Sequence, residues 1–226
     1  ANKINIDTDN FFKDFNIKTN GFSFSGSAKS LYLKLYDINN ISNFFLKGNF
    51  SKSNIFVNKN YIKNFSGYVE SSKNKLFINS SSNDIKFSFK EVVRKDLFFK
   101  LFDGKITIED FNNPIISFNQ VLLKNEEIDI NLSGFVDIKE DRMKVVSSIN
   151  FIDMRYITNY FPNSFISLES SNYFSSAFTK GYSRDAKIFI NGSISDFPFY
   201  DSLYGISYAV FPINNLDVNY KKDWLP

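Results

Sequence analysis

The chain has 226 residues, with 27 basic and 24 acidic side chains, a formal net charge of +3, and neither cysteine nor histidine. Its charges are spread along the sequence without a basic run, which excludes the surface that tracks a nucleic-acid backbone, so no nucleic-acid partner is expected. The absence of Cys and His excludes thiolate chemistry and removes the commonest general base and the commonest ligand of transition metals.

From Phe15 to Phe151 the sequence predicts strand after strand, separated by Asn, Ser, Gly and Lys. Apolar and polar residues alternate within these strands, which is the pattern of an antiparallel sheet with one buried face. The alternating apolar positions are Leu31, Leu33 and Leu35, then Leu76 and Ile78, then Ile85, Phe87 and Phe89, then Ile106 and Ile108, and then Ile128, Ile130 and Leu132.

Turn signals divide this region further. Residues 73–75 and Glu140-Asp141 each predict a turn, and Asp103-Gly104 predicts a two-residue hairpin that joins LFFKLF to KITIED. Because no long helical crossover separates the strands, we expect antiparallel neighbours in a meander.

One short amphipathic helix is predicted near residues 164–180. Pro162 ends the strand expected before it, and Asn163 or Ser164 caps its first turn. Gly181 provides the left-handed exit after Lys180. The apolar face of this helix comprises Ile166, Tyr173, Phe174, Ala177 and Phe178. Beyond Gly181 the period returns to two, with Ile188, Ile190 and Ile194 on one face.

These elements predict a mainly β chain with roughly a dozen strands, which at about 4.8 Å each would stack to roughly 55–60 Å. Open sheets of that size curl or split, so the sheet closes as a barrel, divides into a sandwich, or curls into a trough with an apolar inside. We expect one segment over residues 1–226, made of a strand meander (1–154) followed by the helix and the last strands (155–226). Because the chain starts at Ala1 and stops at Pro226, we expect it to be part of a longer protein.

Motifs for catalysis or metal binding are weak. Ser72 and Lys75 fit S-x-x-K, but such a match is expected by chance in a chain rich in Ser and Lys. Asp7 and Asp9 begin like a calcium loop, but Phe12 stands where that loop needs glycine. We therefore expect no enzyme activity, no cofactor and no metal.

The region from residue 128 to 226 carries a series of motifs in a characteristic order. Tyr160-Phe161-Pro162 precedes the predicted helix, Gly181 follows it, and a strand then leads to Asp196-Phe197-Pro198-Phe199. A Tyr220 segment and Trp224-Leu225-Pro226 close the series. In this order the motifs resemble the AsmA-like region of YhdP-type proteins. Two departures are Tyr173-Phe174, where the family usually has Trp-Leu, and Leu225, which separates the Trp from the Pro.

The resemblance implies a periplasmic segment of a Gram-negative envelope protein, held in the inner membrane by an anchor that lies outside this sequence. It also implies a bridge-like protein that conducts phospholipid toward the outer membrane along a hydrophobic β groove. The implied partners are phospholipid acyl chains and, at either end of the groove, other envelope proteins. The motif residues that carry the resemblance are Pro162, Gly181, Asp196, Phe197, Pro198, Phe199, Trp224 and Pro226.

The curled trough and the implied function together give a set of candidate groove residues. The candidate lining is Leu31, Leu33, Leu35, Phe87, Phe89, Ile106, Ile108, Ile128, Ile130, Leu132, Ile188, Ile190 and Ile194. Ile166, Tyr173, Phe174 and Phe178 of the helix are expected to cover part of this apolar face. The rival hypothesis is a non-conducting β sandwich of the cell envelope, in which the same residues form a dry core and the edge strands bind protein partners.

Overall fold

A computed structural model describes residues 4–7, 13–19, 22–35, 44–72, 74–90, 92–110, 113–164 and 166–219. Thirteen strands within these ranges belong to one sheet. In chain order they are β1 (Ile4–Asp7), β2 (Lys13–Thr19), β3 (Phe22–Leu35), β4 (Phe44–Val57), β5 (Asn60–Ser72), β6 (Lys75–Ser88), β7 (Leu97–Glu109), β8 (Ile115–Lys124), β9 (Ile128–Asp137), β10 (Arg142–Phe151), β11 (Phe178–Ser193), β12 (Ile206–Val210) and β13 (Ile213–Val218).

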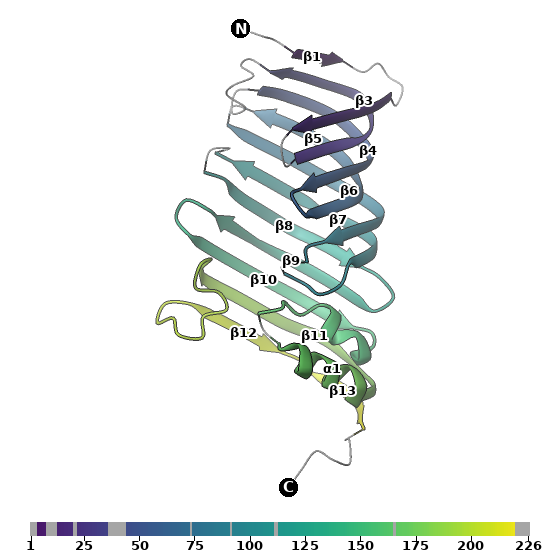
Figure 1. Ribbon diagram of the computed structural model, residues 1–226, viewed down its shortest axis with the longest axis vertical. Helices are drawn as coiled ribbons and strands as arrows, with labels where there is room; N and C mark the ends of the chain where they lie inside the picture. The colour runs from purple at the N-terminus through teal and green to yellow at the C-terminus, as the bar shows by residue number, and fades with distance from the viewer. Residues whose placement is uncertain are drawn as a thin grey trace.

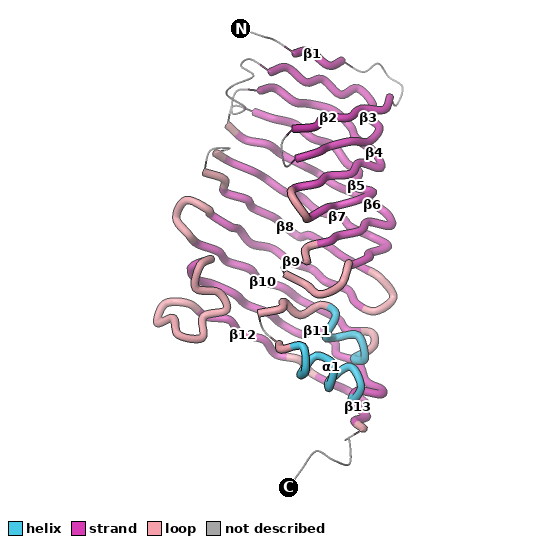
Figure 2. Tube along the Cα trace, in the orientation of Figure 1, coloured by secondary structure: helices cyan, strands magenta, loops and turns pink. Residues whose placement is uncertain are grey.

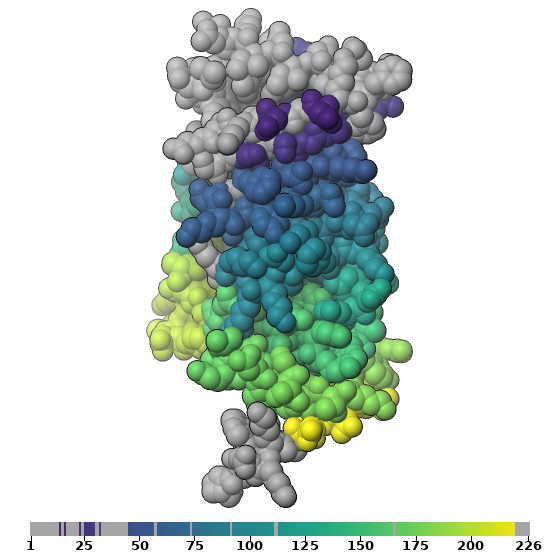
Figure 3. Space-filling view, turned by 45° about the vertical axis from the view of Figure 1, so that its right-hand side comes forward, coloured from purple at the N-terminus to yellow at the C-terminus, as the bar shows by residue number. Residues whose placement is uncertain are grey.

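The sheet is an antiparallel meander. Each strand from β3 to β11 pairs with its neighbours in sequence order, so the chain advances steadily along the long axis of the molecule (Figures 1 and 3). The order ends with β1 on one side and β12 on the other, and these two edges do not pair. The predicted mainly β class, the antiparallel pairing and the curled open sheet are confirmed.

Each edge of the sheet is made of two short strands in place of one long one. β1 and β2 both pair with β3, and β12 and β13 both pair with β11. The break between β12 and β13 contains Phe211 and Pro212, and it lies opposite the part of β11 where Asp185 has a positive φ of 58°.

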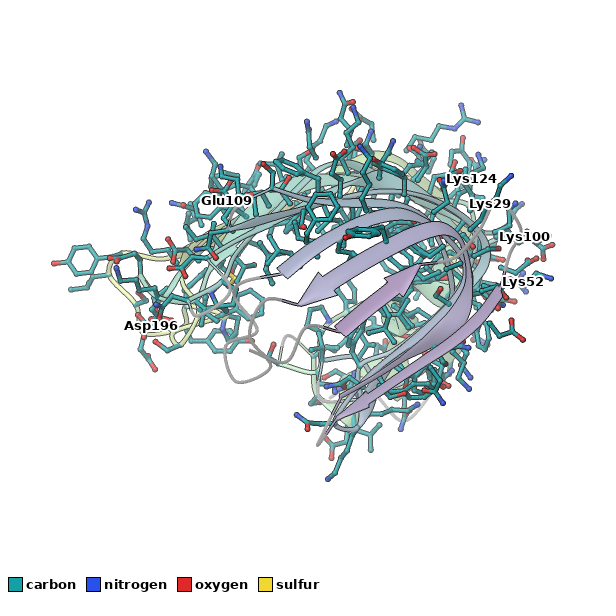
Figure 4. The ribbon with its side chains drawn as sticks, turned by 90° about the horizontal axis from the view of Figure 1, so that it is seen from above. Lys29, Lys52, Lys100, Glu109, Lys124 and Asp196 are labelled. Atoms are coloured by element: carbon teal, nitrogen blue, oxygen red, sulfur yellow. The ribbon has the colours of Figure 1, made fainter. Side chains whose placement is uncertain are left out.

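The long strands curve because irregularities recur in the middle of successive strands. Residues other than glycine adopt a positive φ inside β4, β5, β6, β8 and β11, and they are Lys52, Asn64, Asp84, Gln120 and Asp185. The pairing register shifts beside four of these positions, as expected of β-bulges, which bend a strand and increase its twist. Seen along its long axis, the sheet curls into a trough with Lys29, Lys52, Lys100, Glu109 and Lys124 on its outer side (Figure 4).

Side chains of the neighbouring strand replace the ladder hydrogen bonds that the bulges remove. Lys52 N donates to Ser66 Oγ (3.0 Å), Gln120 N to Ser133 Oγ (2.9 Å), and Asp185 N to Asn150 Oδ1 (2.8 Å). Backbone donors need such partners wherever the ladder is interrupted. The Ser and Asn residues of these strands therefore support the bend, in addition to forming turns.

The helical region differs in detail from the prediction. Helix α1 (Leu168–Ala177) lies inside the expected range, but its N-cap is Ser167, whose Oγ accepts from Ser170 N (3.1 Å), and not Asn163 or Ser164. The element before Pro162 is a 3-10 helix, η1 (Met154–Asn159), and not a strand, because the Asp153 side chain accepts from Arg155 N and starts a helical turn. Gly181 is not the helix exit. It lies inside β11, where its φ of 132° lets the strand pass close to Leu216 of β13.

The predicted hairpin at Asp103-Gly104 is wrong. Both residues lie inside β7, which pairs along its whole length with β6. A side chain at Gly104 would overlap the Val121 backbone of β8, with its Cβ only 2.8 Å from Val121 Cα. The glycine is thus required for close approach of two strands and does not mark a turn.

The buried core lies on the concave side of the sheet and runs through all its central strands. Its fully buried members include Ile85, Ile128 and Ala186, each with 0% exposure, from β6, β9 and β11. Helices η1 and α1 lie at the C-terminal end of the trough, next to β11 and β13 (Figures 1 and 2).

Candidate functional site

The concave face of the sheet contains an apolar cavity of about 690 Å³. It extends across strands β6 to β12, and every residue that lines it is apolar except two serines and two tyrosines, which are Ser147, Tyr160, Ser207 and Tyr208. Its volume falls within the range of roughly 300–1,000 Å³ that is typical of small-molecule sites. The cavity is therefore large enough for a ligand, and its chemistry suits an aliphatic chain.

Eight of the candidate lining residues surround this cavity. They are Phe87, Phe89, Ile106, Ile128, Ile130, Leu132, Ile188 and Ile190. Ile108 is partly buried in β7 but lies beyond the cavity, and Ile194 lies past the end of β11, where its N–H donates to Asp141 O (3.2 Å). The side chains of Leu31, Leu33 and Leu35 lie outside the described residues. Contact of any of these residues with lipid remains a prediction.

Several lining residues were not identified from the sequence, and the bulges explain why. In β8, Phe118 and Val121 both face the cavity although they are three residues apart, because Gln120 at the bulge reverses the alternation. Phe99 and Phe102 of β7 do the same beside Asp84 of β6. The strict alternation of apolar and polar residues therefore fails at these points. The signal in the sequence is the polar residue at which the alternation breaks, here Gln120 or Asp84.

Two loops cover the cavity. Ile166, Tyr173, Phe174 and Phe178 are all absent from its lining. We use the name strap for residues 89–90 and 92–96, between β6 and β7, together with residues 160–164, between η1 and α1. Phe89, Val92, Tyr160, Phe161 and Pro162 of the strap line the cavity. In Figure 2 the two loops cross in front of the sheet near β9 to β11.

Hydrogen bonds join the two loops of the strap to each other. Asn163 N donates to Val92 O (2.7 Å), and Asn163 Nδ2 donates to Lys90 O (3.2 Å). Arg94 Nη2 donates to the carbonyl oxygen of Ile166. A third loop contributes through Tyr200, whose hydroxyl donates to Ser164 O (3.0 Å). A few hydrogen bonds therefore hold the loops together, whereas the strap residues that face the cavity are mainly apolar.

Tyr160 is held at the wall of the cavity by a polar cluster. Its hydroxyl donates to Glu127 Oε2 (2.8 Å) and accepts from Asn125 Nδ2 (2.9 Å), while its ring packs against Phe99 and Phe151. Burial raises the pKa of Tyr160 well above its ordinary value, so the hydroxyl stays protonated. The Tyr-Phe-Pro motif thus fixes one loop of the strap to the turn between β8 and β9.

Asp96 fixes the other loop. Its carboxylate binds the ammonium groups of Lys86 and Lys90, each at 2.7 Å, and accepts from the hydroxyls of Ser88 (2.7 Å) and Tyr61 (2.9 Å). Hydrogen bonding by Lys86, and then by Lys90, holds the pKa of Asp96 well below its usual range. The loop is consequently anchored to β5 and β6 at its C-terminal end.

The cavity ends toward the N-terminus at a cluster of aromatic rings. Phe65 packs between Phe50 and Phe102, with ring centroids 5.2 and 5.7 Å apart, and Phe102 in turn contacts Phe87 at 5.9 Å. Phe50 and Phe65 are buried but do not line the cavity. At this level of the sheet, side chains fill the interior of the trough.

The Asp-Phe-Pro-Phe motif packs against glycine backbone. Phe199 is buried, and its ring occupies the space that a Cβ would need at Gly192 of β11 and at Gly205 before β12, with separations of 2.6 and 2.2 Å. Asp196 is exposed, whereas Phe197 and Pro198 are partly buried. Trp224 and Pro226 of the motif series lie outside the described residues.

Neither a metal site nor a membrane-spanning helix is found in the described part of the chain. Its Asp and Glu residues do not gather in groups of three or more that could hold a metal ion. Among the same residues, no helix is long and apolar enough to cross a membrane.

Comparison with known proteins gives one family. The family model described as YhdP protein matches residues 15–226, which is most of the chain. No curated protein and no solved structure matches the sequence.

Proposed function

The chain belongs to the YhdP family, and on this premise we propose that it is a segment of a cell-envelope protein that carries lipid acyl chains along its curled sheet. The proposed lipid is phospholipid, moved toward the outer membrane by a non-catalytic mechanism. The full protein would be anchored in the inner membrane, with this segment in the periplasm.

One observation carries the proposal, namely the apolar cavity on the concave side of an open sheet. Moving a lipid through water exposes its acyl chains at about 0.8 kcal/mol per CH₂, which is on the order of 12 kcal/mol for a tail of about 16 carbons. A carrier must replace the lost apolar contacts, and the cavity offers apolar side chains from strand after strand. Such transport needs no nucleophile, general base or metal.

The alternative is a non-conducting β module of the envelope that binds protein partners. The ring cluster around Phe65 favours it, because side chains fill that part of the trough. The two edges of the sheet, at β1 and β12, also offer backbone groups to an added strand. A substitution within the cavity distinguishes the two functions.

We expect Ile130→Asp to leave the protein folded and to abolish lipid binding. Ile130 lines the cavity, so a carboxylate there would face hollow space and would repel an acyl chain. Lipid that copurifies with the unmodified protein is measured by native mass spectrometry and by extraction, and folding by circular dichroism.

Two further substitutions serve as controls. Val146→Asp adds the same charge on β10 at a position that is 47% exposed and outside the cavity, so it should change neither folding nor lipid content. Ile85→Asp buries the charge at a position with 0% exposure and should unfold the protein. If Ile130→Asp unfolds the chain as Ile85→Asp does, the site is a packed core and the carrier function is wrong.

A further inference from the structure

The strap contains two cationic groups without an acidic partner in the described part of the chain, and one of them, Arg94, has a buried donor atom. Among the described residues, Lys86 and Lys90 both bind Asp96, but neither Arg94 nor Lys95 forms an ion pair. Arg94 uses Nη2 to donate to a backbone carbonyl, that of Ile166. Its Nη1 is buried and has no hydrogen-bond partner. Of the buried side-chain atoms without a partner in the described chain, it is the one nitrogen.

An unpartnered buried guanidinium donor is unfavourable, because the group loses its hydration and gains nothing in return. Arginine is also the side chain best suited to bind a phosphate or a carboxylate, through two parallel hydrogen bonds. The arrangement at Arg94 therefore favours any change that brings an anion to it.

The cavity reaches solvent at the loop that contains this arginine, although Arg94 itself does not line the cavity. Val92 lines the cavity and is 54% exposed, and it lies two residues from Arg94 in the same loop. Tyr208 of the edge strand β12 also lines the cavity and is 56% exposed. An acyl chain in the cavity can thus have its head group at the strap, on the open side of the trough.

We propose that the strap is the lateral entrance of the cavity for an anionic amphiphile, and that the head group of this ligand replaces the Ile166 carbonyl as the partner of Arg94. The ligand class is a long aliphatic chain with a phosphate or carboxylate head. When the head group takes over Arg94, one of the ties that hold the strap closed is released. This inference rests on the proposed function and adds the head-group chemistry and the route of entrance.

The first experiment compares ligands that share a chain and differ in the head group. Dissociation constants of the purified chain are measured for palmitate, for a lysophospholipid with a palmitoyl chain and a phosphate monoester head, and for hexadecanol. We expect the charged ligands to bind about tenfold more tightly than hexadecanol, as one charge-assisted pair contributes on the order of 1.4 kcal/mol. The two charged ligands distinguish a carboxylate from a phosphate preference, and inorganic phosphate alone should bind much more weakly than either.

Arg94→Gln should remove the preference for the charged ligands and leave the affinity for hexadecanol within about twofold of its original value. Arg94→Lys should keep part of the preference. Lys95→Gln is the matched control, since it removes a neighbouring exposed charge, and it should keep the whole preference. The role of Arg94 would be overturned if Arg94→Gln lost the same affinity for charged and uncharged ligands, or lost no affinity at all. Tight binding of inorganic phosphate by itself would overturn it as well.

The second experiment closes the entrance by a disulfide. The chain has no cysteine, so Val92→Cys combined with Asn163→Cys introduces the only thiols, at positions joined by a 2.7 Å backbone hydrogen bond. We expect oxidation to slow the uptake of a fluorescent fatty acid at least about tenfold, and reduction to restore it. In the single variant Asn163→Cys, the oxidant should not change the rate of fatty-acid uptake.

The two proposals fail in different ways. Uptake that is unchanged by the disulfide, in a protein that still binds hexadecanol, would mean that lipid enters elsewhere while the carrier function stands. The carrier function would be overturned if the protein bound neither palmitate nor hexadecanol and if Ile130→Asp and Val146→Asp had the same effect on lipid content and on folding. This inference would then fall with it.

Discussion

At the scale of single residues, a few polar groups hold the loops that cover an otherwise apolar site. Asp96 binds the ammonium groups of two lysines, and Tyr160 joins the second loop to Asn125 and Glu127. Arg94 donates through Nη2 to the Ile166 carbonyl, and its buried Nη1 has no hydrogen-bond partner among the described residues. The bases of the strap are thus held by clusters of side chains, whereas its middle is held by a few hydrogen bonds to backbone carbonyls.

Replacing Asp96 with Asn should destabilise the protein at neutral pH, and the difference should shrink in acid. The carboxyl has a lower pKa in the folded than in the unfolded chain, so its stabilisation is fully present above the unfolded pKa, near 4. As the pH falls below that value, toward the lower folded pKa, the unmodified protein loses this contribution while Asp96→Asn has none to lose. Urea denaturation at pH 7 and pH 3 measures the two differences.

Asp201→Asn is the control for this substitution. Asp201 is exposed, and the structure of the described residues shows no hydrogen bond or ion pair for its side chain. Its replacement should therefore have little effect at either pH. If the difference in the free energy of unfolding between the unmodified protein and Asp96→Asn is the same at pH 7 and at pH 3, the assigned role of the carboxylate is wrong.

At the scale of elements, the strands achieve their curvature by interrupting their own pairing. At Lys52, Gln120 and Asp185 a backbone N–H turns away from the ladder, and a side chain of a neighbouring strand accepts it. Ser82 does this for β5, since its Oγ accepts from Ser66 N (2.8 Å) and lies 3.0 Å from Ser66 O. Buried serines on an otherwise apolar face are therefore part of the bend.

Ser82→Ala should lower the free energy of unfolding by about 1–3 kcal/mol, because Ser66 N–H loses its acceptor where water has little access. Ser82 is 1% exposed. The adjacent Ser81→Ala is the matched control, as Ser81 is exposed on the other face of the same strand, and it should change stability by less than about 0.5 kcal/mol. Urea denaturation of the three proteins provides the comparison, and equal midpoints for the two variants would show that the hydroxyl does not support the bend.

At the scale of the whole molecule, the trough is hollow in one part and filled in another. The cavity extends from β6 to β12, and the rings of Phe50, Phe65 and Phe102 fill the interior beside it. Under the proposed function, an acyl chain lies in the hollow part, and the ring cluster limits how far that chain reaches toward β4 and β5.

Phe65→Ala should extend the cavity and make stability depend more strongly on lipid. Removing the ring costs about 3–5 kcal/mol when the space stays empty, and a bound acyl chain that fills it recovers part of that cost. Thermal denaturation should therefore show a larger increase in Tm on addition of palmitate for Phe65→Ala than for the unmodified protein. Phe77→Ala, at a position that is 44% exposed, should show the same increase as the unmodified protein. Equal increases for all three proteins would mean that lipid does not reach the ring cluster.

Much of the architecture follows from local patterns in the sequence. Alternation of apolar and polar residues determined the strands, and short turns between them determined antiparallel pairing, because both effects act between residues that are close in the chain. The helix near residues 164–180 followed in the same way, although its cap is Ser167 and not Asn163 or Ser164. Ile128, Ile130 and Leu132 occupy alternate positions of β9, and all three line the cavity.

Only the tertiary structure decided where alternation reverses, what covers the trough and how much of it is hollow. Gly104 resembles a hairpin residue in the sequence, but the approach of β8 explains it. The two loops of the strap meet across more than 60 residues of intervening chain, so no local pattern relates Asn163 to Val92 or Arg94 to Ile166. Packing between distant segments also determines whether apolar side chains fill a space or line it, and for that reason the residues of the cavity wall and its cover became apparent only from the fold.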